Sequence, residues 1–377
     1  EYATALNEVY EYRGLPPLYS TAEIQKFADG SDPWLYPNTD WFAETYKKWA
    51  RQNSATINLS GGTESLRYFV SIGNKFQDAY YKNSATNYKQ IDFRSNLDAE
   101  INKYISVGFD ISGRMENRNY PTRSADDIMW MLVRGKPTEP AYWPNGKPGP
   151  DIEYGNNPVV ISTDQTGYDR SKNYFLNSNL KINIKVPWIK GLALTGNAAV
   201  DKQFDFNKIF LKPWYLYTWD KVTYDENNQP VLAAAKRGID QANLNESMAD
   251  RQNILFNGLV TYENTIGKHS INLLVGVETI EGKGDFLSAY RGYFESPLLD
   301  QLDAGGATGI NNGGSAYHTA RMNYFGRANY NFGGKYLAEF VWRYDGSYIF
   351  PEEKRFGFFP GGSLGWRVSE EEFWKNG

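Results

Sequence analysis

Two aromatic clusters are the residues of this chain best suited to ligand binding. The first contains Tyr142 and Trp143, and the second contains Trp214, Tyr215 and Trp219. Flat rings beside carboxylates and amides stack on the apolar faces of sugars or peptides, while the neighbouring polar groups form hydrogen bonds. We therefore expect these five residues to bind substrate. The alternative is that the rings pack the connecting segments against each other or against a partner protein.

The sequence carries no pattern typical of covalent catalysis, of a metal site or of a cofactor site. It has no cysteine, and no Ser, His and Asp set or glycine-rich phosphate loop emerges from it. The histidines His269 and His318 form no two-histidine metal motif. The three consecutive carboxylates of residues 370–372 are expected to be solvated surface charges. We therefore expect a binding protein with no cofactor and no enzymatic activity.

Composition excludes two further classes of protein. The 377 residues carry a net charge of only −4 and no Lys/Arg tract, which disfavours a nucleic-acid partner. No apolar run approaches the roughly 18 residues of a membrane helix, although strands of a transmembrane β-barrel give a much weaker hydropathy signal. The aromatic share of 16% is high and suits a lipid interface or a sugar-binding cleft.

Long strand-like runs lie between and around the aromatic clusters. Apolar or small side chains alternate with polar ones over residues 91–102, 105–112, 176–186, 192–200, 254–262, 271–277, 322–332 and 336–345. The apolar faces hold no charge, and the opposite faces hold Asp92, Arg94, Glu100, Lys181, Asp201, Glu278, Glu339 and Arg343. Soluble strands average roughly 5 to 6 residues, whereas a tilted strand needs roughly 9 to 11 to cross a bilayer. Run length and charge placement therefore favour lipid, not a protein core, behind the apolar faces.

The connections between these runs alternate strictly in length. Short turns at residues 61–64, 102–103, 187–191, 264–267 and 333–334 alternate with longer segments at about 78–88, 118–172, 207–249 and 283–318. An up-and-down meander then has all tight turns at one end, as in barrels with short periplasmic turns and long extracellular loops. Aromatic residues beside the tight turns are expected to form an interfacial girdle: Tyr104, Trp188, Tyr262, Phe332 and Tyr336. The sequence predicts an all-β fold, with about 11 strands of a large antiparallel transmembrane β-barrel in outer-membrane lipid.

Several motifs resemble one family, the SusC/RagA-type TonB-dependent transporters of the Bacteroidota outer membrane. The resemblance rests on Tyr36–Phe42, on Leu59–Gly62 followed by Tyr68 and Ser71, on Arg343–Ser347, on Phe356–Pro360 and on Gly365–Val368. It extends over the whole chain in order and spacing. The pair Gly361-Gly362 departs from the plainer residues that usually follow this Phe-Pro.

The resemblance implies a 22-stranded barrel with an N-terminal plug, a SusD-like lipoprotein cap and energy supplied through TonB. Residues 1–53 are then the first extracellular loop region, with irregular and short helical structure, and residues 54–377 are part of the barrel. The plug and the TonB-contacting segment are absent from this chain. Because eleven strands cannot close a barrel of the even-numbered type, we expect the remaining strands to come from another chain or from further sequence.

The implied function is active import of a bulky nutrient, either a glycan oligomer or an oligopeptide, across the outer membrane. Two alternatives remain open from the sequence. One is a soluble carbohydrate-active or sugar-binding β-protein, suggested by the loop aromatics alone. The other is an iron-chelate receptor built on a related barrel.

Overall fold

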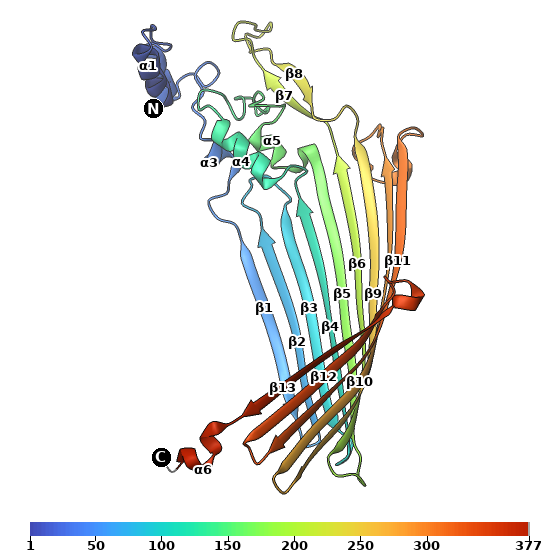
Figure 1. The fold of residues 1–377 in the computed structure, drawn as a ribbon. Coiled ribbons are helices and arrows are strands. Elements are labelled where there is room, and N and C mark those ends of the chain that lie inside the picture. Colours follow the sequence, from blue (N-terminus) through green and yellow to red (C-terminus); the bar gives the residue numbers. More distant parts are fainter. Residues whose placement is uncertain (376–377) are drawn as a thin grey trace.

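The computed structural model describes residues 1–375, and one antiparallel sheet of eleven strands dominates it (Figure 1). The strands are β1 (Gln52–Gly62), β2 (Leu66–Asp78), β3 (Asn87–Glu100), β4 (Ile105–Tyr120), β5 (Gly167–Lys185), β6 (Leu192–Leu211), β9 (Asn243–Ile266), β10 (His269–Arg291), β11 (Ile310–Phe332), β12 (Tyr336–Ser347) and β13 (Phe356–Trp366). Each strand pairs with the next in this order. The predicted large antiparallel sheet of about eleven strands is confirmed.

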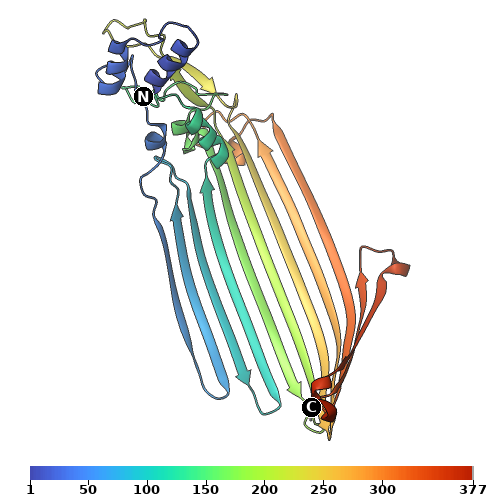
Figure 2. The same ribbon diagram turned by 60° about the vertical axis from the view of Figure 1, so that its left-hand side comes forward.

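The sheet curves strongly along its width. In Figure 1 β12 and β13 pass in front of the lower ends of the first strands, and Figure 2 shows these two strands bending away from the others. β1 and β13 each pair on one side only within the described chain. The completion of the barrel by further strands stays a prediction.

Tight turns and long connections lie at opposite ends of the sheet, as the sequence indicates (Figure 2). The turn between β11 and β12 uses Gly333 and Gly334 with φ of 59° and 74°, which a residue with a Cβ rarely adopts. β9 and β10 contain 24 and 23 residues and extend into regions expected to be loops. The connections there shorten to residues 212–242 and 292–309.

The six α-helices within residues 1–375 are short, and five of them lie at the loop end of the sheet (Figure 1). Their bounds are α1 (Tyr2–Tyr12), α2 (Thr21–Asp29), α3 (Trp41–Thr45), α4 (Ala125–Arg134), α5 (Pro158–Ile161) and α6 (Glu372–Lys375). Ser20 and Glu23 form a capping box at the start of α2, and Gly30 ends it with φ 66°. Across the described residues, no helix is both long and apolar enough to cross a membrane.

The two faces of the sheet differ as predicted. We call the face that carries Ile57, Phe256 and Val275 the outer face; these three side chains are 78%, 57% and 53% exposed. The opposite, inner face carries the charged residues, because successive side chains point to opposite sides of a strand. The pairing register keeps each face continuous: Ile72 lies beside Phe93 on the outer face.

The main hydrophobic core lies outside the sheet, in the connecting segments. It joins α3, α4 and α5 to β7 (Trp214–Thr218), which pairs with β8 (Ala233–Arg237) in a separate hairpin that the sequence pattern did not reveal. Ile128, Val160 and Ile161 are fully buried in this core. The indole Nε1 of Trp41 donates a hydrogen bond to the Lys136 carbonyl at 3.0 Å and ties α3 to the end of α4. We call α3, α4, α5 and β7 the loop unit.

A second, smaller core fixes the connection between β10 and β11. Phe294 packs against Phe210 and Leu244 at the ends of β6 and β9. The Tyr168 hydroxyl and the Lys208 ammonium both contact Asp300. This connection therefore lies against the outer face of the strand ends.

Candidate substrate-binding site

A large cavity opens on the inner face of the sheet, at the end where the long connections lie. Its volume is about 1320 Å³, which is above the roughly 300 to 1,000 Å³ of ordinary small-molecule pockets. Its walls are the ends of β2, β3, β4 and β5, the connection 79–86, and the segment leading into α4. A cavity of this size beside an open sheet suits an extended, oligomeric ligand.

Strand alternation explains which side chains enter the cavity. Lys75, Tyr88, Glu116, Arg118 and Asp169 sit at inward positions near the ends of their strands. Their neighbours along each strand point outward, and of these neighbours Asn87, at the end of β3, also lines the cavity. The two-residue alternation that places apolar side chains on the lipid-facing surface thus also places these polar and aromatic side chains in the cavity.

Tyrosine rings form one side of the cavity. Tyr46 and Tyr81 stack with ring centroids 5.6 Å apart and an interplanar angle of 22°. Burial raises the pKa of both hydroxyls above the ordinary value, so both remain protonated at neutral pH and can donate as well as accept hydrogen bonds. Rings with a polar tip suit both sugars and peptide groups.

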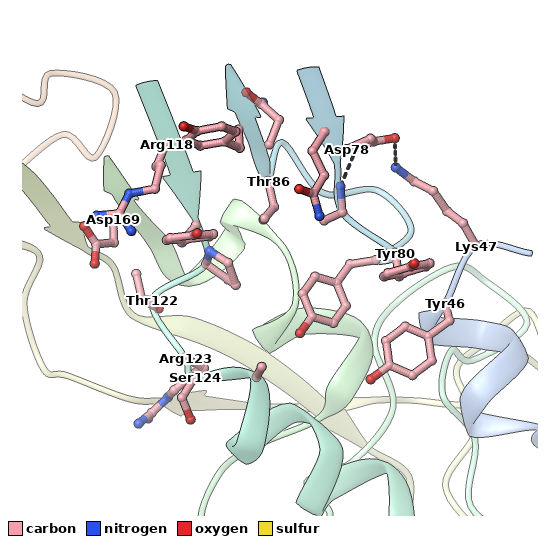
Figure 3. A pocket seen from close by; sticks show the side chains of 18 of the residues that line it. Tyr46, Lys47, Asp78, Tyr80, Thr86, Arg118, Thr122, Arg123, Ser124 and Asp169 are labelled. Atoms are coloured by element: carbon pink, nitrogen blue, oxygen red, sulfur yellow. Dashed lines mark hydrogen bonds and ion pairs between the residues drawn. The ribbon is translucent and has the colours of Figure 1, made fainter. Parts of the chain in front are cut away.

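Charges of both signs line the cavity. Lys47 and Asp78 form an ion pair at 2.7 Å on one side, and Arg118 and Asp169 lie on the other (Figure 3). The Arg118 Nε contacts the Ser171 hydroxyl at 3.3 Å, and its guanidinium lies 5.7 Å from the Tyr120 ring centre. The remaining N–H groups of Arg118 are free to bind a carboxylate, carbonyl or hydroxyl of a ligand.

The five aromatic residues predicted to bind substrate lie in or beside the loop unit. Trp143, Trp214 and Trp219 are buried, Tyr142 is half-buried, and Tyr215 is 49% exposed. None of the five is among the described residues that line the inner cavity. Their role in substrate binding stays a prediction.

Each buried indole donates to a backbone carbonyl within the connecting segments. Trp143 donates to Tyr217 at 2.8 Å, Trp214 to Gly155 at 3.0 Å and Trp219 to Thr223 at 2.9 Å. Trp34 stacks on Trp143 with centroids 5.5 Å apart. In this conformation the three rings hold the segments together, which is the alternative that the sequence left open.

The residues that line the cavity are not among those predicted from the sequence to bind substrate. A signal was present for Tyr88 and Arg118, because the alternation of residues 91–102 and 105–112, continued into the adjoining long connections, gives both an inward position. No local signal marks Tyr46 or Tyr81, because their contact joins segments 35 residues apart in the chain. In the described part of the chain, no group of three or more His, Cys, Asp or Glu side chains is arranged to hold a metal ion.

Comparison with known sequences finds TonB-dependent receptors. The chain is 26% identical over 359 residues to TonB-dependent receptor P3 of Formosa agariphila, covering 90% of this chain and 32% of that protein. It is 25% identical over 370 residues to TonB-dependent receptor SusC of Bacteroides thetaiotaomicron, covering 90% of this chain and 33% of SusC. The chain thus spans about a third of the curated relatives it matches. No family model matches the sequence.

Comparison with solved structures finds the same fold. The RagAB peptide importer in its open-open state superposes with a TM-score of 0.72 at 22% identity, over 96% of this chain and 41% of that one. Its closed-closed state gives a TM-score of 0.67 at 22% identity, over 98% and 42%. The predicted resemblance to SusC/RagA-type TonB-dependent transporters is confirmed, and with it the outer-membrane β-barrel fold and location.

Proposed function

We propose that this chain forms part of a TonB-dependent transporter that imports a bulky nutrient, a glycan oligomer or an oligopeptide, through the outer membrane. The observation that carries the proposal is the inner cavity, which lies at the loop end of a barrel wall whose relatives are TonB-dependent receptors. In such barrels the long connections are extracellular. The cavity then lies where a nutrient enters the barrel.

The lining of the cavity supports a polar oligomer as the ligand. Stacked rings, an ion pair and an arginine with unused donors recognise planar or ring-shaped units that also carry hydrogen-bonding groups. Saccharide units and peptide units both have this character. The chemistry required of the site is binding and release, so the cavity needs no nucleophile or general base.

A SusD-like surface lipoprotein is the partner we propose for the loop end. α1 and the turn after it lie at the far end of the molecule from the tight turns (Figure 1) and expose four apolar side chains: Val9, Tyr12, Leu15 and Leu18. Exposed apolar clusters of this kind are typical of protein interfaces. TonB is expected to act through a plug segment of the full-length transporter.

Import by the full-length transporter in cells tests the proposal. Cells that depend on this transporter are supplied with either a defined oligopeptide mixture or a glycan oligomer as the limiting nutrient, with and without functional TonB. We expect uptake of one of the two classes, and we expect it to stop without TonB. Uptake that persists without TonB, or uptake of neither class, would contradict the proposal.

A cavity variant connects this import to the site. Arg118→Gln removes donors to the ligand and is expected to reduce uptake about ten-fold, since a hydrogen bond to a charged group contributes about 1.5 to 3 kcal/mol. Lys48→Gln, which changes an exposed lysine beside the cavity, is the matched control. Equal uptake by both variants would place the substrate elsewhere, with the loop aromatics as the next candidates. Iron-chelate uptake by the same cells tests the remaining alternative.

A further inference from the structure

The outer face of β3, β4 and β5 carries an uncharged band of well-defined height. Outward-facing side chains are free of charge over residues 91–101, 105–115 and 176–186. Each of these ranges matches the roughly 9 to 11 residues with which a tilted strand crosses a membrane. The hydrocarbon of the bilayer therefore ends at the loop-end limit of this band.

Basic side chains lie beyond that limit, directly after Ile91 on β3 and after the uncharged Tyr174 on β5. Lys89 pairs in register with Asn117, which pairs with Lys172 on the next strand. All three have the same outward orientation as Ile91, because each is an even number of residues from an outward-facing apolar residue of its own strand. Two strand spacings place the backbones of the two lysines about 9.6 Å apart.

Arg170 extends this group by one outward position. Its Nε contacts the Asn119 side-chain oxygen at 3.3 Å, and its guanidinium lies 3.7 Å from the Tyr168 ring centre. We call Lys89, Asn117, Asn119, Arg170 and Lys172 the basic patch. It combines three cations with two amide side chains and contains no carboxylate.

The two lysines have no counterion among the described residues, which separates them from other outward-facing cations of the sheet. Farther along the sheet, Lys202 pairs with Asp250 at 2.8 Å, and Lys283 pairs with Glu281 at 2.8 Å. Lys89 and Lys172 are exposed and form no ion pair with any residue from 1 to 375. The outward-facing Lys202 and Lys283 are thus neutralised, and Arg170 lies near the Asp300 carboxylate, whereas Lys89 and Lys172 have no counterion in the described part of the chain.

We propose that the basic patch binds the phosphate groups of a lipid headgroup in the outer leaflet. Acyl chains that contact the uncharged band place the phosphates of their headgroup immediately above it, at the level of Lys89 and Lys172. Ammonium and guanidinium groups form charge-assisted hydrogen bonds with phosphate, and the amides add neutral donors. The two cations, about 9.6 Å apart, suit a headgroup that carries two phosphates.

Lipid binding to the full-length transporter in detergent micelles tests the proposal. The probes are lipid A with both phosphates and the same lipid with both phosphates removed. Lys89→Gln combined with Lys172→Gln is expected to weaken binding of the phosphorylated lipid about 30-fold, since each lysine near a lipid surface contributes about 1 kcal/mol. Binding of the dephosphorylated lipid should be weak and equal in both proteins.

Two controls keep the result interpretable. Lys181→Gln combined with Lys185→Gln removes the same charge from the inner face of β5 and should leave lipid binding unchanged, and Lys89→Arg with Lys172→Arg should retain it. Three results would overturn the proposal. The first is an equal loss of lipid binding in the two Gln double variants, and the second is a change of less than two-fold in the Lys89→Gln and Lys172→Gln variant. The third is wild-type binding of the dephosphorylated lipid that equals binding of the phosphorylated lipid. Displacement of the lipid by inorganic phosphate at the same phosphorus concentration would overturn it as well, because it would assign the patch to free phosphate.

Discussion

The loop unit and the barrel wall contain the same kinds of apolar side chain but bury them in different surroundings. In the loop unit Ile128, Val160 and Ile161 are 0% exposed. On the outer face of the wall Ile57 and Val275 are 78% and 53% exposed. The loop unit packs protein against protein, like the core of a small water-soluble domain, while the wall leaves its apolar surface to lipid.

The difference teaches where the stability of each region comes from. The wall is a single layer whose strands are joined by continuous backbone pairing, up to 23 residue pairs between β10 and β11. The loop unit has little regular pairing and depends on its buried side chains. Substitutions that remove buried volume should therefore damage the loop unit, and substitutions that add charge to the outer face should damage the wall.

The largest effect is expected from a cavity in the loop unit. Ile128→Ala removes a fully buried side chain from α4 and should destabilise the loop unit by about 2 to 5 kcal/mol. Hydrogen exchange of amides in residues 125–166 measures the loss, and amides of β9 and β10 should keep their protection. Val133→Ala, on the exposed side of the same helix, is the control and should change stability by less than about 0.5 kcal/mol. If exchange in the wall rises equally, the two regions do not unfold separately.

A charge at the middle of the lipid-facing band gives the next largest effect. Leu180→Arg on β5 should destabilise the barrel in a bilayer by about 2 to 4 kcal/mol, because its guanidinium enters hydrocarbon. The neighbouring Asn179→Arg points inward, opposite Asp110, and should cost far less. Denaturant unfolding of both variants in lipid vesicles measures the contrast. Similar losses in the two variants would show that the outer face of β5 does not meet lipid.

The sequence predicts the wall far better than the loop unit, for a physical reason. A lipid-facing strand repeats its pattern every two residues, so residues 336–345 show both faces without knowledge of any partner strand. The loop unit is held by contacts between distant segments, such as Trp41 with Lys136 and Trp143 with Tyr217. No local period records such contacts, and the aromatic residues in them look the same as ligand-binding residues.

The candidate site shows the same division. The inward positions of Tyr88 and Arg118 follow from the alternation of side chains along their strands. The stack of Tyr46 on Tyr81 instead depends on a contact between two connecting segments that are distant in the sequence. The carboxylates of residues 370–372 looked like a hydrated run in the sequence. In the structure Glu371 instead binds Lys335, Tyr336 and Trp366, at least five residues away along the chain.

A smaller effect is expected at the connection between β10 and β11. Burial alone would raise the pKa of Asp300, but the hydrogen bond from Tyr168 and the Lys208 ammonium outweigh it and hold the pKa below its ordinary value of 3.8. The stabilisation is therefore complete above about pH 4 and is lost as the pH falls through the lowered pKa of the folded state. Asp300→Asn should loosen this connection by about 1 kcal/mol at pH 7.

Protease cleavage within residues 292–309 measures that loosening. The variant should be cleaved faster than the wild type at neutral pH, and its cleavage should not respond to acid in the way the wild type does. Asp303→Asn changes an exposed carboxylate of the same connection and should leave cleavage unchanged. Cleavage that rises equally in the two variants would assign the effect to net charge and not to the anchoring contacts.

The smallest effect is expected at Glu371, in the segment that follows β13. Its carboxylate accepts hydrogen bonds from the Tyr336 hydroxyl at 2.7 Å, the Lys335 ammonium at 3.1 Å and the Trp366 indole at 3.1 Å, and these lower its pKa from 4.5 to about 2. The contribution to stability is therefore full above about pH 4.5 and disappears as the pH falls toward about 2. Hydrogen exchange at the amides of residues 370 and 371 should show this loosening in the wild type.

Glu371→Gln should loosen the same amides at neutral pH and remove their response to acid, because the amide side chain does not titrate. Glu372→Gln alters the neighbouring carboxylate without touching these donors and serves as the control. The effect should remain confined to the segment after β13, since β12 and β13 are joined by their own backbone pairing from Tyr336 with Trp366 to Gly346 with Phe356. Increased hydrogen exchange throughout β12 would contradict this expectation and show that the Glu371 carboxylate stabilises the pairing of β12 with β13.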